Sequence, residues 1–157
     1  GVMFFDDPEA AFANIRSLLA PGGRLVFACW QSLFVNDWLF VPAAAVAQVL
    51  PLPEPPGPDA PGPFAFADTD RVAGILAAAG FRDPAFEPCA AKVWVGDTPQ
   101  AAAEHLRTTG MGRVIFADAA PELIDQALAK AAAAVAPHAG PDGIELDGAA
   151  WLVTATA

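Results

Sequence analysis

The sequence predicts an α/β fold in which helices alternate with the strands of a largely parallel sheet. Residues 25–30 form an uninterrupted apolar run between a glycine pair and polar residues, which is typical of a strand buried on both faces. An amphipathic helix directly precedes this run, and a second helix and strand occur at residues 68–95. Helix, glycine turn and apolar strand make up the second half of a β-α-β unit.

The first helix is expected to begin at Pro8. Asp7 can accept hydrogen bonds from the amide groups of the first turn, and proline suits the first helical position. Gly22 and Gly23 are expected to turn the chain after the helix. The side chains predicted to face the core recur at helical spacing and are Phe12, Ile15, Leu18 and Leu19.

The middle of the chain is predicted to hold a helix and a connector. Asn36 and Asp37 can cap a helix that runs to about Leu50. In residues 51–63, seven of the thirteen positions are proline, which indicates an extended surface connector. Its Pro-x-x-Pro spacings lack a flanking Arg or Lys, so a polyproline recognition ligand is not favoured.

The last part of the chain alternates again between helices and strands. Asp68 is expected to cap a helix that ends at Gly80 in the left-handed conformation. The remaining predicted elements are a proline-kinked strand at 81–95, a helix at 98–109, a helix from residue 121, and a closing strand at 148–157.

Composition narrows the classes of partner. The chain has 157 residues, 55% of them hydrophobic, and a formal net charge of −10. This charge repels phosphate backbones and anionic lipids, so we expect neither nucleic acid nor membrane as a partner. No apolar stretch reaches the roughly 20 residues that span a bilayer and no signal peptide is recognisable, which predicts a cytoplasmic protein. Cys29 and Cys89, without close Cys or His neighbours, are interpreted as reduced, buried thiols.

Three motifs carry a resemblance to a known family. Residues 3–8 read Met-Phe-Phe-Asp-Asp-Pro, residues 19–27 read Leu-Ala-Pro-Gly-Gly-Arg-Leu-Val-Phe, and residues 79–81 read Ala-Gly-Phe. In this order they resemble the class I, Rossmann-like methyltransferases that depend on S-adenosylmethionine, in the broad subgroup that includes quinone-biosynthesis enzymes. The resemblance identifies residues 1–157 as the carboxy-terminal part of such a domain, and the abrupt apolar start at Gly1 agrees with a piece of a longer gene product.

The fold implied by this resemblance is a seven-stranded sheet whose last strand runs antiparallel and inserts beside the fifth. Residues 24–31, 81–95 and 150–156 would be the fifth, sixth and seventh strands, and residues 98–139 a helical insertion. The family's glycine loop, ribose-binding acid and adenine-binding side chains lie on the first four strands, which this sequence lacks. S-adenosylmethionine is therefore the implied cofactor, with unknown binding residues here, and we expect the chain by itself to be inactive.

The resemblance also suggests residues that bind a small-molecule acceptor. Met3, Phe4 and Phe5 would follow the fourth strand at the edge where the methyl group is transferred, and Trp30 and Gln31 end the fifth strand on that edge. Ordinary core packing is the competing interpretation of each. The substrate-binding residues predicted in this way are Met3, Phe4, Phe5, Trp30, Gln31 and Trp38.

Few other side chains suggest chemistry. Trp38, with Phe34 and Phe40, could form an apolar lid over an aromatic acceptor, although core packing is the commoner role for such residues. His105 is the candidate for a general base, but a surface histidine is the commoner reading, and His138 carries less signal. Further residues weighed and set aside are Asp6, as part of a helix start, and Ser17 and Ser32, which lack a nucleophile elbow.

A non-catalytic binding or dimerisation module is the alternative to a methyltransferase. A short sheet leaves one flank of residues 24–30 unpaired, and an exposed edge of this kind invites pairing with another chain. We therefore also expect homodimers through this edge.

Overall fold

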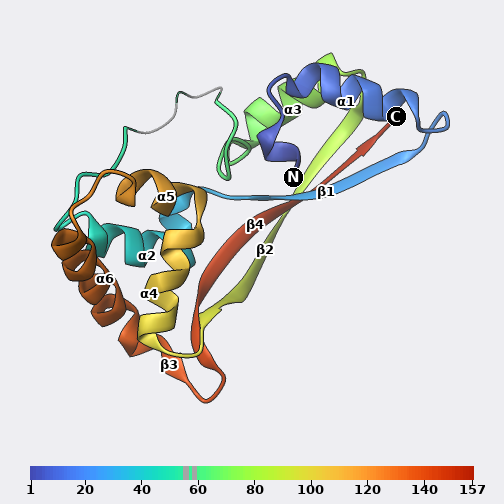
Figure 1. Ribbon diagram of the computed structural model, residues 1–157. Coiled ribbons are helices and arrows are strands. Elements are labelled where there is room, and N and C mark those ends of the chain that lie inside the picture. Colours follow the sequence, from blue (N-terminus) through green and yellow to red (C-terminus); the bar gives the residue numbers. More distant parts are fainter. Residues whose placement is uncertain (55–56, 58–59) are drawn as a thin grey trace. The chain divides into compact units, whose positions relative to one another are not determined.

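The computed structural model describes residues 1–54, 57 and 60–157 and has an α/β fold (Figure 1). The chain divides into two compact units. The first comprises Gly1–Ser32, Pro56–Ala90 and Ala149–Ala157, and the second comprises Leu33–Pro55 and Ala91–Gly148. The predicted insertion at 98–139 therefore falls in the second unit, together with residues that precede it by more than forty positions.

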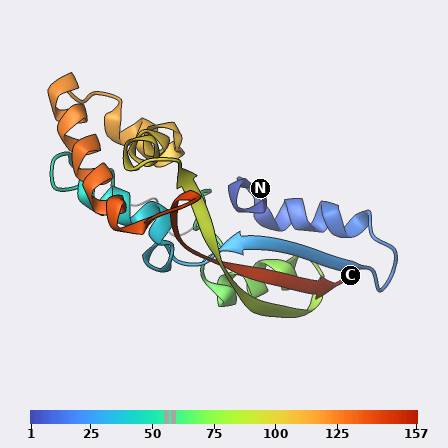
Figure 2. The ribbon, with the colours of Figure 1, turned by 90° about the horizontal axis from the view of Figure 1, so that it is seen from below.

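The first unit holds two helices on one sheet. Its elements are the 3-10 turn η1 (Val2–Phe4), α1 (Pro8–Ser17), β1 (Arg24–Trp30), α3 (Thr69–Ala78), and parts of β2 (Arg82–Gly96) and β4 (Gly143–Thr156). The strand order is β1-β4-β2, and β4 is antiparallel to β1. In Figure 2 the arrow of β4 points opposite to those of β1 and β2. The expectation that the last strand pairs antiparallel with the strand at 24–31 is confirmed.

Local sequence signals start and stop these helices as predicted. The Asp7 carboxylate accepts a hydrogen bond from the amide of Ala10 at 2.9 Å. Asp68 accepts from the amides of Asp70 and Arg71 at 2.9 and 3.3 Å. Gly80 ends α3 with a φ of +86°, a conformation that glycine adopts without a steric penalty.

A cluster of aromatic rings fills the space between the two helices and the sheet. Phe12 of α1 is fully buried, and its ring centroid lies 5.4 Å from that of Phe27, 6.1 Å from that of Phe66 and 6.5 Å from that of Phe81. Helices α1 and α3 also contact each other. Since both helices share this core with β1 and β4, they cover the same face of the sheet.

The prediction that residues 25–30 are buried on both faces is wrong. Burial alternates along β1, so that Leu25, Phe27 and Cys29 face the core while the side chain of Val26 is 52% exposed. On the central strand, Leu152 is 37% exposed on the same outer face. Leu18 is another error: it lies beyond the last helical turn and is 80% exposed.

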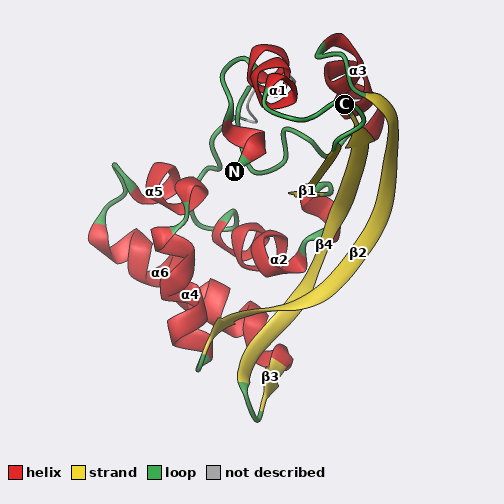
Figure 3. Cartoon of the chain, turned by 90° about the vertical axis from the view of Figure 1, so that its right-hand side faces the viewer, coloured by secondary structure: helices red, strands yellow, loops and turns green. Residues whose placement is uncertain are grey.

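The second unit packs helices against the ends of the two long strands. Its elements are η2 (Leu33–Val35), α2 (Asp37–Val46), α4 (Pro99–Thr108), α5 (Gly110–Phe116), α6 (Pro121–Val135), η3 (Ala136–His138) and β3 (Ala139–Gly140), which pairs with β4 (Figure 3). Val95, Ala102, Val135, Ile144 and Leu146 form its buried core. Contacts join α6 to both α2 and α4.

Boundaries differ from the predictions where local signals are weak. Helix α2 ends at Val46, four residues before the expected Leu50, and β4 begins at Gly143 instead of residue 148. Helix α5 is separate from α4 because Thr109 is extended and caps the new helix through its hydroxyl. The predicted connector at 51–63 and its Pro-x-x-Pro spacings lie partly outside the described residues.

Truncation of Phe12 tests the aromatic core. Replacing it with alanine is expected to lower the free energy of unfolding by about 3–5 kcal/mol, because the cavity left among four rings cannot collapse fully. Urea unfolding followed by circular dichroism measures this change. Phe4→Ala is the matched control: its side chain is 55% exposed, so a loss as large as that of Phe12→Ala would contradict this description of the core.

Candidate functional site

The carboxyl end of β1 is the place where the first unit gathers most of the predicted site residues. Residues 62–67, the segment before α3, are held at this end of β1 by hydrogen bonds from several parts of the chain. The amide of Gly62 donates to the carbonyl of Met3 at 3.0 Å, and the indole Nε1 of Trp151 donates to the carbonyl of Ala67 at 3.1 Å. These two bonds hold the segment to η1 and to β4.

Two further side chains hold the same segment. The guanidinium of Arg71 donates to the carbonyl of Ala65 at 2.6 Å and lies over the ring of Phe66, 5.8 Å from its centroid. The thiol of Cys29 donates to the carbonyl of Phe66 at 3.6 Å. Arg71 was not singled out from the sequence, because nothing local links it to η1 or to β1.

Five of the six predicted substrate-binding residues lie in this unit, in different settings. Met3 is buried in the core and Trp30 packs against that core. Phe4 is 55% exposed, whereas the ring of Phe5 packs edge-on against Phe12. Gln31 donates from its side-chain amide to the carbonyl of Ala150 at 2.9 Å. The structure thus brings Met3 and Trp30 into one apolar cluster and leaves Phe4 turned towards solvent.

The chemistry of this end of the sheet is apolar. Cys29 is its one buried thiol among the described residues, and burial raises its pKa from 9.0 to about 11. A thiol with a raised pKa stays protonated and is a poor nucleophile. Cys89 is exposed, so the prediction that both thiols are buried is wrong for it.

The sixth predicted residue, Trp38, lies in the second unit beside a small cavity. The volume of this cavity is about 10 Å³, enough for about one water molecule and too small for an organic acceptor. His105, the candidate base, lines the same cavity, so the structure does bring these two predicted residues together. The lining residues are Trp38, Leu39, Pro42, Val95, Ala102, His105, Leu106, Thr109 and Val135.

Asn36 forms a buried polar contact that its position before a helix did not predict. It is the one fully buried polar side chain among the described residues, and its Oδ1 accepts from the indole Nε1 of Trp38 at 3.1 Å. This bond fixes the indole in one orientation. Its sequence signal, a helix-capping asparagine, pointed to a different role, and no side-chain cap bond from Asn36 is present.

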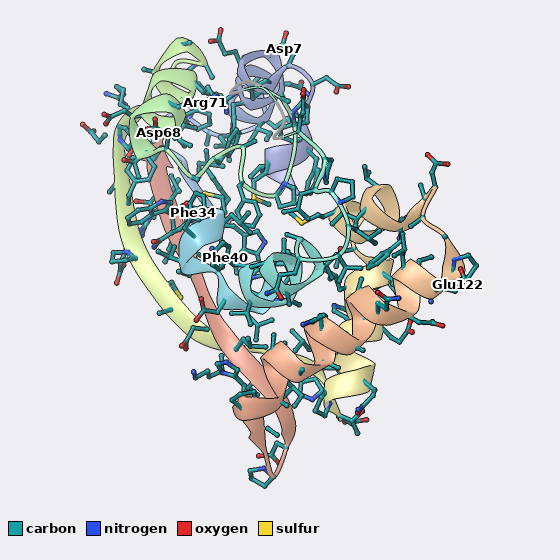
Figure 4. All side chains as sticks on the ribbon, turned by 90° about the vertical axis from the view of Figure 1, so that its left-hand side faces the viewer. Asp7, Phe34, Phe40, Asp68, Arg71 and Glu122 are labelled. Carbon is teal, nitrogen blue, oxygen red and sulfur yellow. The ribbon has the colours of Figure 1, made fainter. Side chains whose placement is uncertain are left out.

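The proposed lid residues sit on η2 and α2. The rings of Phe34 and Phe40 meet edge to face with centroids 5.6 Å apart, and Phe34 is 74% exposed (Figure 4). Asp6 and His138 are exposed as well, as a helix start and a turn would predict. No group of three potential metal ligands occurs in the part of the chain that the structure describes.

Among the described residues, two pairs of glycines that lie close together in the sequence do not form a cofactor-binding loop. Gly22 and Gly23 lie in the turn between α1 and β1, at the amino end of that strand. Gly110 and Gly112 resemble a Gly-x-Gly turn in sequence, but they begin α5 and follow a helix instead of a strand. A phosphate- or methionine-binding loop needs a strand directly before it.

Comparisons with known proteins do not name a family. No model of a protein family matches the chain, and no curated protein matches it either. Among the described residues, none of the helices is long and apolar enough to cross a membrane.

The raised pKa of Cys29 predicts a loss of stability in alkaline solution. The folded protein keeps the proton up to about pH 11, whereas the unfolded chain releases it near pH 9.0, so the stabilisation is complete below pH 9 and is lost between these values. Urea unfolding at pH 8, 9, 10 and 11 should show a steeper decline for the native sequence than for Cys29→Ala. Equal slopes would contradict a raised pKa, and Cys89→Ala serves as the control with an exposed thiol.

Replacement of Asn36 tests the polar centre of the second unit. Asn36→Leu removes the acceptor for the indole of Trp38 and leaves that donor without its bond, which is expected to cost about 1–3 kcal/mol. The emission of Trp38 should broaden or shift, as seen by comparison with a Trp38→Phe background. Asn14→Leu, a change of the same kind on the exposed surface of α1, should leave both stability and emission nearly unchanged.

Proposed function

We propose that the chain is the carboxy-terminal part of a Rossmann-like, S-adenosylmethionine-dependent methyltransferase that acts on a small, apolar acceptor. The observation that carries this proposal is the strand order β1-β4-β2, with β4 antiparallel to β1. Strands that follow each other along the chain are usually neighbours in a sheet. Here β1 and β2, which the helix α3 connects, are separated by a strand from the end of the chain.

That arrangement is what the resemblance implies for the last three strands. The pieces of the resemblance fall at the matching places: the Gly-Gly turn lies directly before β1, and Ala79-Gly80-Phe81 lies between α3 and β2. The resemblance and the strand order support each other because one comes from residue identity and the other from hydrogen-bonded pairing.

The residues of this chain suit an acceptor site better than a donor site. Methyl transfer from a sulfonium mainly requires that donor and acceptor are aligned and water is excluded, and a base is needed only for some acceptors. Trp30 is half-buried at the carboxyl end of β1, the edge at which open α/β sheets bind ligands, and it packs on the apolar core that contains Met3 and Phe66. The described residues contain no glycine loop after a strand, so they do not fit the donor, which the residues outside this chain would have to hold.

Titration of S-adenosylmethionine separates this proposal from its alternative. By calorimetry the 157-residue chain should show no saturable binding up to about 1 mM, whereas the protein extended through the reading frame before Gly1 should bind in the micromolar range, roughly the affinity of a working cofactor site. S-adenosylhomocysteine should behave in the same way.

Two results would contradict the proposal. Tight binding to the 157-residue chain would show that the donor site is not missing. If a folded, extended protein bound neither compound, the proposed methyltransferase function would be ruled out. A non-catalytic binding or dimerisation module would then be favoured.

A further inference from the structure

A groove opens on the surface of the second unit between α4 and α6, which lie side by side (Figure 3). Its volume is about 480 Å³, within the range of about 300–1,000 Å³ that is usual for ligand sites. Gln100, Ala103 and Glu104 line it from α4, and residues between Asp125 and Ala136 line it from α6 and its carboxyl end. All of these residues belong to the second unit.

The lining of this groove consists mainly of alanine. Ala129 and Ala133 are exposed, whereas Ala103 and Ala132 are buried, and Leu128 is half-buried. The axes of packed helices lie about 8–10 Å apart, depending on the side chains between them. Because these side chains are small, a third helix can approach α4 and α6 closely.

The exposed alanines follow the axis of α6. Ala129, Ala133 and Ala136 recur at steps of four and three residues, so they lie on one side of the helix. From Asp125 to Ala136 the lining extends over about 16 Å, at the rise of about 1.5 Å per residue. This length corresponds to three helical turns, which matches an occupant that presents one apolar side chain per turn.

The charged residues that line the groove are carboxylates on both walls, Glu104 on α4 and Asp125 on α6. The Nη1 of Arg107 lies 3.2 Å from the Oε2 of Glu104 and offsets part of that charge. No cation among the described residues pairs with Asp125. Since the whole chain carries a net charge of −10, its field attracts a cationic partner.

We propose that this groove binds a basic amphipathic helix of a partner protein. The apolar face of that helix packs on the alanines, and its Lys or Arg side chains pair with Asp125 and Glu104. Helices that lay an apolar face into a groove are recognised through side chains three to four residues apart. The proposal depends on the groove alone, so it holds whether or not the protein transfers methyl groups.

A second copy of the chain fits the groove less well than a basic helix. The helix α6 that it would insert carries Glu122 and Asp125 but only one cation, Lys130. Its insertion would bring further carboxylates towards Asp125 of the first copy. Like charges at close range oppose association, so charge favours a basic partner.

Nuclear magnetic resonance of the 157-residue chain tests the proposal with a synthetic helix. The probe is a peptide of about 18 residues, long enough to form a helix, with leucine and alanine on one face and lysine on the other. Titration should shift the amide signals of Ala103, Ala129 and Ala133 and leave those of α1 unchanged. The dissociation constant should be on the order of 100 μM or tighter and should rise with added salt, because salt screens the ion pairs. The same peptide with glutamate in place of lysine should not bind.

Charge variants separate the groove from the net charge of the chain. Asp125→Lys should weaken binding of the lysine peptide about fivefold or more and allow the glutamate peptide to bind. Glu145→Lys makes the same change of charge at an exposed residue of β4 that does not line the groove. It should bind both peptides as the native chain does.

A second pair of variants tests the apolar wall. Ala129→Gln places a polar side chain in the groove and should weaken binding of the lysine peptide about fivefold or more. Ala13→Gln, the same change at an exposed position of α1, should have no effect on binding. Both positions are exposed, so each variant is expected to fold, and circular dichroism checks this.

Three results would overturn the proposal. The first is the absence of shifts at the groove with about 1 mM lysine peptide. The second is equal weakening by Asp125→Lys and Glu145→Lys, which would mean that net charge alone attracts the peptide. The third is a dimer in sedimentation that shifts the groove signals without peptide, which would assign the groove to a second copy. None of these results depends on S-adenosylmethionine binding.

Discussion

The antiparallel register between β1 and β4 is the constraint on which the rest of the first unit depends. It places Leu25 opposite Ala155, Phe27 opposite Val153 and Cys29 opposite Trp151, so that one face of the strand pair is apolar and packed. Because side chains alternate with a period of two, a slip of one residue would turn this whole set towards solvent. The buried ring of Phe12 needs that face as its partner, and α1 and α3 take their positions from the same core.

The register also explains how the segment before α3 is held at the end of β1. Cys29 and Trp151 are cross-strand partners, and each holds a carbonyl of the segment before α3. A change in pairing would separate these two donors from Phe66 and Ala67. The apolar core that contains Met3 therefore depends on strand pairing, because its residues come from segments that lie far apart along the chain.

The residues predicted to bind the acceptor are divided between the two units of the structure. Met3 belongs to the core of the first unit, and Trp30 packs against that core. Trp38 belongs to a separate unit, where Asn36 and the neighbourhood of His105 define its surroundings. The sequence offered no means to see this division, because aromatic residues at helical spacing predict burial without indicating the core in which they are buried.

By itself the sequence determined the local elements: the caps at Asp7 and Asp68, the glycine at the end of α3, and the apolar strand before Gln31. These depend on contacts within a few residues, which the sequence displays directly. Only the tertiary structure decided that β1 alternates, that Leu18 is exposed, and that residues 62–67 are held at the end of β1. An apolar run in the sequence is the same whether one face of the strand is buried or both. The burial of each face depends on helices and strands that lie far away along the chain.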